Sequence, residues 1–371
     1  MKILFITSSP LHKMHIVDLY INEISNMFET EIWDVSPMFL HYGNSDFSEI
    51  PLISTFNEFC NRLDKFSDGQ RIAVITNILI FDLHVVYKEL RKRKIPIISI
   101  DKESIIFWMK DNYERRHLDR ISETERKKLI IKAFPILRQI YSYMEYQHAK
   151  FDYILGAYNY YPDSCRRFYR IHNMKYDEYL RTEKKAPVVK GKYILFMDAG
   201  LAHLPMHDNK PNAIDKQEYL EVMNAFFDRV ESQFGMPVII AAHPKSGYKE
   251  NDFNRRPIIL YKTPELVKYA ELVLAHYSTS LIEVVLQKKK VIFMYSEDYM
   301  RSDSHTVLET ASEYAHMLNA SFIDVKITGK IIVNFDEKAY DAFIENHIIR
   351  REKAKYSNGQ LIIEFLHRLD K

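Results

Sequence analysis

Cysteine and glycine are both scarce in this chain, whose 371 residues include two cysteines and nine glycines. The cysteines, Cys60 and Cys165, lie far apart and lack the spacing of metal ligands. A disulfide framework is therefore not expected, and a reducing compartment fits. The few glycines form neither a GxGxxG motif nor a Walker A loop, which disfavours classical dinucleotide binding and P-loop phosphate transfer.

An excess of charge and long apolar runs are also missing. The formal net charge is +2, so the composition gives no reason to expect nucleic acid as a partner. The most apolar stretch, residues 72–87, is interrupted by Asn77, Asp82 and His84 and is too short to span a bilayer. The N-terminal apolar run lacks a cleavage site and predicts a first strand rather than a signal peptide. We therefore expect a cytoplasmic protein, with peripheral contact to the inner membrane left open.

Short apolar runs alternate with amphipathic helical patterns along the chain, and such alternation predicts parallel sheets covered by helices on both faces. The predicted fold is α/β, with two Rossmann-like domains facing across a cleft. The predicted domains are residues 1–188 and 189–371, with the C-terminal helices packing back on the first domain. The predicted strands are 2–7, 30–35, 71–78, 95–100, 151–157, 193–199, 237–243, 257–261, 271–276 and 290–295, and the main helices are 15–28, 120–148, 216–234 and much of 336–370.

Polar side chains follow four strands of the second half, at the point where each strand ends. Ligands of open α/β sheets bind beyond the carboxyl ends of the strands, so these four tips form the candidate site. In chain order the tips carry Asp198, His203, His207 and Asp208; His243, Pro244, Lys245 and Ser246; Tyr261, Lys262 and Thr263; and His276, Ser278, Thr279, Ser280 and Glu283.

Two of these tips suit an anionic ligand. The last strand tip leads directly into a helix, and helix N-termini offer unpaired N–H groups to which the hydroxyls of residues 278–280 add donors. A capping box between Ser280 and Glu283 is the alternative there. His243 and Lys245 can also donate to phosphate oxygens, so the two tips together predict a cradle for a monophosphate or a diphosphate.

The His-Pro pair at 243–244 and the hydroxyl triplet at 278–280 resemble motifs of the bacterial sialyltransferases and polysialyltransferases of GT-B fold. In those enzymes a His-Pro motif and a Ser-Ser or Ser-Thr motif grip the phosphate of CMP-sialic acid. Capsule and teichoic-acid polymerases of similar fold carry a comparable pair. The resemblance covers residues 192–300 best. It implies an inverting, metal-independent glycosyltransferase that needs no cofactor and takes a nucleotide sugar, with a CMP-sugar favoured.

The same resemblance implies that the first domain binds the acceptor and the second binds the donor. The acceptor would be a bacterial surface polysaccharide or lipooligosaccharide, as an oligosaccharide or a lipid-linked glycan. Four alternatives stay open: a UDP-hexose glycosyltransferase, a CDP-alditol phosphotransferase of the polymerase type, a nucleotide-sugar epimerase and a non-catalytic, two-lobed binding protein. The implied donor-binding residues are His243, Pro244, Lys245, Lys262, Thr263, Ser278, Thr279, Ser280 and Glu283.

The general base that an acceptor hydroxyl requires is not fixed by the sequence. The sialyltransferases carry two acidic residues before a glycine, whereas the nearest match here, residues 198–200, has one. That acid could equally brace its own loop. We favour the carboxylates over the histidines among the candidates, which are Asp198, Asp208, His203 and His12.

Three further patterns each allow two interpretations. His203 and His207 have the spacing of two zinc ligands on a helical turn, but the proline between them disfavours that helix, and no metal site is expected. Lys262 and Thr263 either frame the nucleotide base or begin a helix with Thr263 as its N-cap. The basic, aromatic stretch 166–181 is either a docking surface for an anionic lipid-linked acceptor or a solvated helix face.

Overall fold

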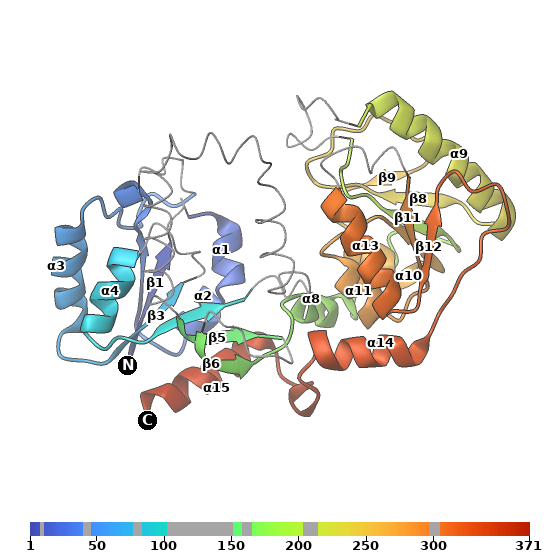
Figure 1. Ribbon diagram of the computed structural model, residues 1–371. Coiled ribbons are helices and arrows are strands. Elements are labelled where there is room, and N and C mark those ends of the chain that lie inside the picture. Colours follow the sequence, from blue (N-terminus) through green and yellow to red (C-terminus); the bar gives the residue numbers. More distant parts are fainter. Residues whose placement is uncertain are drawn as a thin grey trace, which may run out of the picture. The chain divides into compact units, whose positions relative to one another are not determined.

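The computed structural model describes residues 1–7, 11–39, 46–76, 84–101, 151–157, 165–202, 214–296 and 305–371. They form two compact units, both drawn in Figure 1. Each unit is built on a six-stranded parallel sheet. Unit 1 comprises Met1–Met174 and Ile349–Lys371, and unit 2 comprises Lys175–Ile348. The predicted fold class, α/β with two Rossmann-like domains, is confirmed. The chain passes between the units near 174 and again near 348. The sequence predicts a boundary near 188 and C-terminal helices that pack back on the first domain.

The sheet of unit 1 has the strand order β2-β1-β3-β4-β5-β6. Every residue of β1 is buried, as expected for a central strand of a parallel sheet. The chain runs from β1 to β2 on one side and continues with β3 on the other, so the switch point lies between β1 and β3. The strands are β1 (Lys2–Thr7), β2 (Thr30–Asp34), β3 (Ile72–Thr76), β4 (Ile97–Ile100), β5 (Phe151–Gly156) and β6 (Cys165–Arg170).

Helices cover both faces of this sheet. One apolar cluster joins α3 and α4 to one face, and another joins α2 and the C-terminal α15 to the other. The single helix predicted over 15–28 is wrong, because Tyr20 adopts a left-handed backbone with φ of 54° and separates α1 from α2. The helices are α1 (Lys13–Asp18), α2 (Ile21–Ser25), α3 (Phe56–Ser67), α4 (His84–Lys92) and α15 (Asn358–Asp370), with 3-10 turns at Ser36–Phe39 and Arg351–Lys353.

Buried hydrogen bonds tie the returning C-terminal segment to unit 1. The His172 backbone N–H donates to Asn358 Oδ1 at 2.8 Å, and the Arg350 N–H donates to His172 Nδ1 at 2.9 Å. Burial lowers the pKa of His172 to about 4, so the ring is neutral and donates from Nε2 to the carbonyl oxygen of Lys353 at 3.1 Å. Residues 349–371 are thereby part of the first unit in structure, although they end the chain.

The sheet of unit 2 has the order β12-β11-β10-β7-β8-β9. The chain moves from β7 to β8 and β9 on one side and then returns to β10 on the other, so the switch point lies between β7 and β10. The predicted strands are confirmed within a few residues, while β12 and the edge strand β6 of unit 1 were not predicted. The strands are β7 (Ile194–Met197), β8 (Val238–Ala241), β9 (Ile258–Ile259), β10 (Leu272–Ala275), β11 (Val291–Tyr295) and β12 (Ser321–Asp324).

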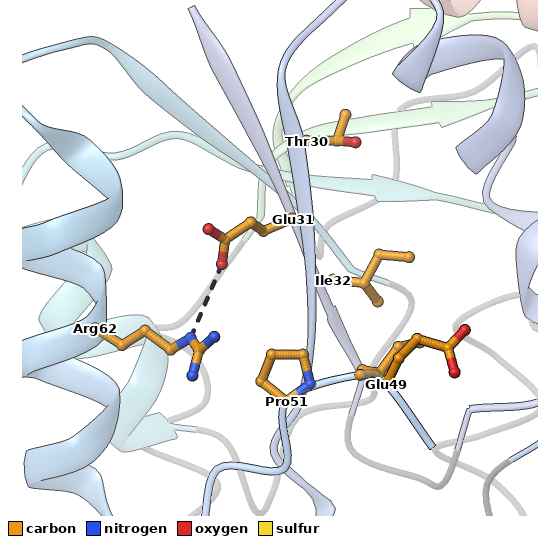
Figure 2. A pocket seen from close by; sticks show the side chains of 7 residues that line it. Thr30, Glu31, Ile32, Glu49, Pro51 and Arg62 are labelled. Carbon is orange, nitrogen blue, oxygen red and sulfur yellow. Dashed lines mark ion pairs between the residues drawn. The ribbon is translucent and has the colours of Figure 1, made fainter. Parts of the chain in front are cut away.

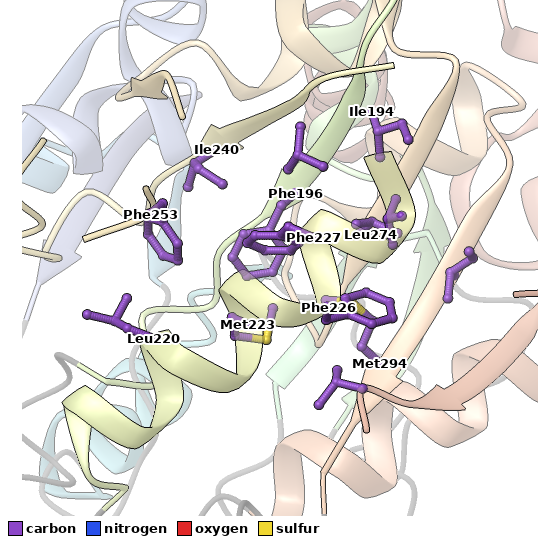
Figure 3. Close-up of a cluster of buried hydrophobic side chains, with 14 of the residues drawn as sticks. Ile194, Phe196, Leu220, Met223, Phe226, Phe227, Ile240, Phe253, Leu274 and Met294 are labelled. Carbon is purple, nitrogen blue, oxygen red and sulfur yellow. The ribbon is translucent and has the colours of Figure 1, made fainter. Parts of the chain in front are cut away.

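The long helix α9 supports the centre of this sheet. It is capped by the Asp215 carboxylate at its start and by Gly235, with φ of 65°, at its end. Figure 3 shows its aromatic face against the strands, where the rings of Phe227 and Phe196 have centroids 5.0 Å apart. The helices of unit 2 are α8 (Lys175–Thr182), α9 (Lys216–Phe234), α10 (Thr263–Tyr269), α11 (Leu281–Leu286), α13 (His305–Met317) and α14 (Glu337–Phe343), followed by a π-helical turn at Ile344–Ile348.

Candidate functional site

All four predicted tips lie side by side in unit 2. The tips after β10, β7, β8 and β9 occur in that order at the carboxyl edge of the sheet, with the β7 tip between those of β10 and β8. Strands lie about 4.8 Å apart, so the β8 and β10 tips are separated by about 10 Å rather than by one strand spacing. A ligand that reaches both tips therefore passes over residues 198–200.

Asp198 is buried, with 5% of its surface exposed, and its carboxylate accepts three hydrogen bonds. Oδ1 accepts from the Gly200 N–H at 2.9 Å and from the Tyr248 hydroxyl at 3.1 Å, and Oδ2 accepts from the His243 N–H at 3.0 Å. Burial raises the pKa of this carboxyl, while the hydrogen bonds from His243, Gly200 and Tyr248 act in the opposite direction. The carboxylate thus links the β7 tip to the β8 tip.

The β8 tip is a compact turn around His243. The Ser246 N–H and hydroxyl both donate to the His243 carbonyl oxygen, at 2.9 and 2.6 Å. The Lys245 backbone N–H donates to His243 Nδ1 at 3.2 Å. Pro244 and Lys245 are exposed and His243 is half-buried. This turn presents an imidazole and an ammonium group at the edge of the sheet.

The β10 tip carries its hydroxyls as predicted, but without the alternative capping box. The Ser280 side chain makes no cap hydrogen bond to α11, and the Ser278 hydroxyl instead accepts from the Ser280 N–H at 3.2 Å. Thr279 is exposed. Because α11 has six residues, the hydroxyls and the local N–H groups, rather than a long helix, are the donors that this tip offers. His276 is buried and neutral, because burial lowers its pKa to about 4, and its Nδ1 bonds the Met294 carbonyl oxygen at 3.0 Å.

Glu283 lies in the buried face of α11 and is 0% exposed. Burial raises its pKa to about 9, and the Glu178 carboxylate on α8 contributes in the same direction. The carboxyl is therefore protonated at neutral pH, and it can donate a hydrogen bond. The resemblance implies that Glu283 helps to bind the nucleotide-sugar donor, and in the structure its side chain is buried.

The tip after β9 begins α10 differently from the prediction. Lys262, and not Thr263, is the N-cap residue, and Thr263 is the first helical residue. Lys262 Nζ lies 3.7 Å from Glu265 Oε1. Tyr261, which the sequence places on this tip but not among the implied donor-binding residues, is 73% exposed and has a φ of 59°. The sequence signal that it offered was an aromatic residue at the end of an apolar strand.

In unit 1, His12 follows the first strand and has an acidic neighbour. His12 Nδ1 lies 3.5 Å from Asp46 Oδ2, and the same carboxylate oxygen accepts from the Lys13 N–H at 3.0 Å. The Lys13 N–H lowers the pKa of Asp46, and the nearby His12 adds to this effect. Both side chains are nearly half exposed, at 47% and 43%. The sequence did not identify Asp46, which is 34 residues further along the chain.

Several predicted features lie elsewhere. His203, His207 and Asp208 fall outside the described residues, as does the predicted helix over 120–148. The basic stretch 166–181 is not a single helix face, since it divides into the edge strand β6 of unit 1 and α8 of unit 2. Within the described part of the chain, no group of three or more His, Cys, Asp or Glu side chains is placed to hold a metal ion. No helix in that part is long and apolar enough to cross a membrane.

An open hollow of about 300 Å³ lies in unit 1. Figure 2 shows its Glu31–Arg62 ion pair, in which Oε2 and Nε are 3.8 Å apart. The hollow contains none of the predicted site residues. It is lined by Thr30, Glu31, Ile32, Glu49, Ile50, Pro51 and Arg62.

Comparison with solved structures finds weak similarity over the whole chain. The spinosyn forosaminyltransferase SpnP aligns with 13% identity over 100% of this chain and 99% of that one, with a TM-score of 0.46. A wall teichoic acid polymerase TagF variant aligns with 10% identity over 100% and 90%, with a TM-score of 0.47. The UDP-GlcNAc 2-epimerase of Methanocaldococcus jannaschii aligns with 14% identity over 99% and 100%, with a TM-score of 0.45. These scores are too low to support a function, so we draw the function from the residues themselves.

No protein-family model matches the chain, and no curated protein matches it either.

Proposed function

We propose that this protein is a nucleotide-sugar-dependent glycosyltransferase of the GT-B class. Unit 2 would bind the donor and unit 1 the acceptor. The favoured donor is CMP-sialic acid or a related CMP-sugar, and the favoured acceptor is a bacterial surface polysaccharide or lipooligosaccharide. Transfer would be inverting and would need neither a metal ion nor a cofactor.

The observation that carries this proposal is the arrangement of donors around the β7 tip. His243 and Lys245 stand on one side of it and the hydroxyls of Ser278 and Thr279 on the other, at the switch point where α/β sheets bind ligands. Imidazole N–H, ammonium and hydroxyl groups all donate to phosphate oxygens. No exposed carboxylate from the β8 or β10 tip opposes an anion there, because Glu283 is buried.

These donors suit the chemistry of glycosyl transfer. Negative charge develops on the leaving phosphate as the glycosidic bond to it breaks, and fixed donors that meet this charge lower the barrier. Lys245 supplies a full positive charge, and His243 supplies a directed N–H. The acceptor hydroxyl must lose a proton to a general base, for which Asp198, Asp208, His203 and His12 are the candidates.

The spacing of the tips also suits a donor with a diphosphate. A gap of about 10 Å between the β8 and β10 tips accommodates two phosphates as well as one. A UDP-hexose glycosyltransferase, whose donor carries a diphosphate, is the second candidate. A CDP-alditol phosphotransferase, a nucleotide-sugar epimerase and a non-catalytic binding protein remain further alternatives.

A thermal-shift series with CMP, CDP, UDP and GDP tests the proposal. A nucleotide at about 100 times its Kd stabilises the folded protein by about 2.7 kcal/mol, which is readily measured. We expect CMP to raise the melting temperature most and His243→Ala to abolish the shift. His316→Ala, at an exposed position on α13, is the matched control and should keep the shift.

Each outcome selects one function. Stabilisation by UDP alone would replace the CMP-sugar with a UDP-sugar, and stabilisation by CDP alone would favour the phosphotransferase. Stabilisation by no nucleotide would refute the donor site. Release of CMP from CMP-sialic acid then separates an enzyme from a binding protein.

A further inference from the structure

A single buried carboxylate joins two of the strand tips. The donors to Asp198 come from its own loop, through Gly200, and from both ends of the next loop, through His243 and Tyr248. Hydrogen bonds to a charged group are roughly twice as strong as those between neutral groups. The β8 tip is therefore fixed to the β7 tip at the start and at the end of the 243–248 turn.

Gly200 fixes the imidazole ring of the same histidine. Its backbone has a φ of 70°, and a Cβ atom at this position would lie 3.2 Å from His243 Cγ and 3.3 Å from Nδ1. Such contacts are closer than van der Waals packing normally allows, so a side chain would displace the ring. The ring of His243 thus lies directly against the glycine backbone, while Asp198 holds its main chain.

The hydrogen bond at Nδ1 decides which ring nitrogen can donate. A backbone N–H can only donate, so His243 Nδ1 is the acceptor of the Lys245 N–H at 3.2 Å. The proton of the neutral ring is therefore on Nε2. Nε2–H is the group that remains for a ligand, and it is a donor whatever the charge of the ring.

We propose that Asp198 is a positioning residue whose buried carboxylate holds the His243 turn so that the imidazole Nε2–H donates to a phosphate oxygen. This inference rests on the proposed nucleotide site for the identity of the ligand. It assigns to Asp198 a role in donor binding in place of proton abstraction. Gly200 and Tyr248 contribute to this positioning, because both donate hydrogen bonds to the Asp198 carboxylate.

The surroundings of the carboxylate suit this role better than that of a base. Three protein donors take up three of the about four lone pairs of its two oxygens, and 5% of the residue is exposed. A general base must instead reach the acceptor hydroxyl at about 3 Å with a free lone pair. Taking up a proton would also weaken the bonds that hold the turn.

The test measures two properties of the Asp198→Asn variant, which are its affinity for nucleotides and the tautomer of its His243 ring. Asparagine keeps the shape but replaces one acceptor oxygen with an NH2 group, which cannot accept from a facing N–H. We expect nucleotide affinity, measured calorimetrically with CMP and UDP, to fall about 10- to 100-fold, as for other residues that orient a binding group. In ligand-free protein, the ¹⁵N spectrum of the His243 ring should change from the Nε2–H tautomer to a mixture, with His243→Gln providing the assignment.

Tyr248→Phe provides a second, milder variant in case Asp198→Asn does not fold. It removes one donor and keeps the ring contact with Phe253, whose centroid is 4.7 Å away. The loss of one hydrogen bond predicts about fivefold weaker nucleotide binding. The matched control is Asp336→Asn at the N-cap of α14, where asparagine caps as well as aspartate and both readouts should stay unchanged.

The two readouts separate this inference from the proposed function. Unchanged affinity and an unchanged tautomer in Asp198→Asn, together with lost sugar transfer, would overturn positioning and identify Asp198 as the base. If the wild-type protein binds none of the nucleotides, the donor site fails. A tautomer change in Asp198→Asn would then still support positioning, and an unchanged tautomer would refute it.

Discussion

Each unit places an aspartate beside a histidine after the first two strands of its parallel sheet, but in different surroundings. In unit 2, Asp198 is buried at the end of β7 and hydrogen bonds the backbone of His243. In unit 1, Asp46 lies at the surface beside His12, which follows β1. In each unit one member of the pair follows the first strand, β7 or β1, which borders the switch point of its sheet. The unit 2 pair is therefore built into the fold, while the unit 1 pair is an addition to its surface.

The largest expected effect is the loss of stability on removing the Asp198 carboxylate, compared with removing that of Asp46. Asp198→Ala removes the acceptor of three hydrogen bonds, and losing the partner of a buried donor costs about 1–3 kcal/mol, so we expect a loss of about 3 kcal/mol in the free energy of unfolding. Asp46→Ala should change this free energy far less, because water replaces its contacts. Urea denaturation of both variants measures the difference. If the two variants lost the same free energy of unfolding, the buried hydrogen bonds of Asp198 would not stabilise unit 2 as proposed.

Gly200→Ala should have the next largest effect. An alanine at positive φ costs about 1 kcal/mol, and the contact of its Cβ with the His243 ring raises the expected loss to about 2 kcal/mol. Gly191 is the matched control, since its φ is 86° and nothing lies within 4 Å of an added Cβ. Gly191→Ala should lose about 1 kcal/mol. If the two variants were equally stable, the ring contact would carry no energy.

The strand β7 and the aspartate that follows it show what the sequence could and could not predict. Continuous apolar runs such as Ile194–Met197 identify buried parallel strands without any knowledge of neighbours, so the fold class and most strands were predicted. The function of Asp198 depends on donors 45 and 50 positions away, and no local pattern contains them. Spacing alone also suggested a capping box for Glu283, whose side chain is in fact buried against other helices.

The two carboxylates should also respond to pH in opposite directions. Burial raises the pKa of Asp198, so the folded state holds this proton more tightly than the unfolded chain does. Its contribution to stability therefore falls as pH rises above the ordinary value of about 4. The Lys13 N–H lowers the pKa of Asp46, so its contribution is present above that value and is lost as pH falls through the lowered pKa.

Unfolding free energies of the wild type, Asp198→Asn and Asp46→Asn between about pH 3 and pH 7 measure these slopes. The difference between wild type and Asp198→Asn should decrease with rising pH, and the difference for Asp46→Asn should increase. Slopes of the same sign for the two variants would show that the surroundings of the carboxylates are alike.

The smallest expected effect is that of His12→Gln on nucleotide binding. The proposed donor site consists of unit 2 residues, and His12 belongs to unit 1, so the thermal shift with CMP should equal that of the wild type. If His12 is the general base, with Asp46 holding its imidazole, the same variant loses sugar transfer while nucleotide affinity is kept. Asp46→Asn should then reduce transfer in the same way but less severely. A lost thermal shift in His12→Gln would instead mean that unit 1 takes part in binding the donor, and the division of roles between the two units would have to be abandoned.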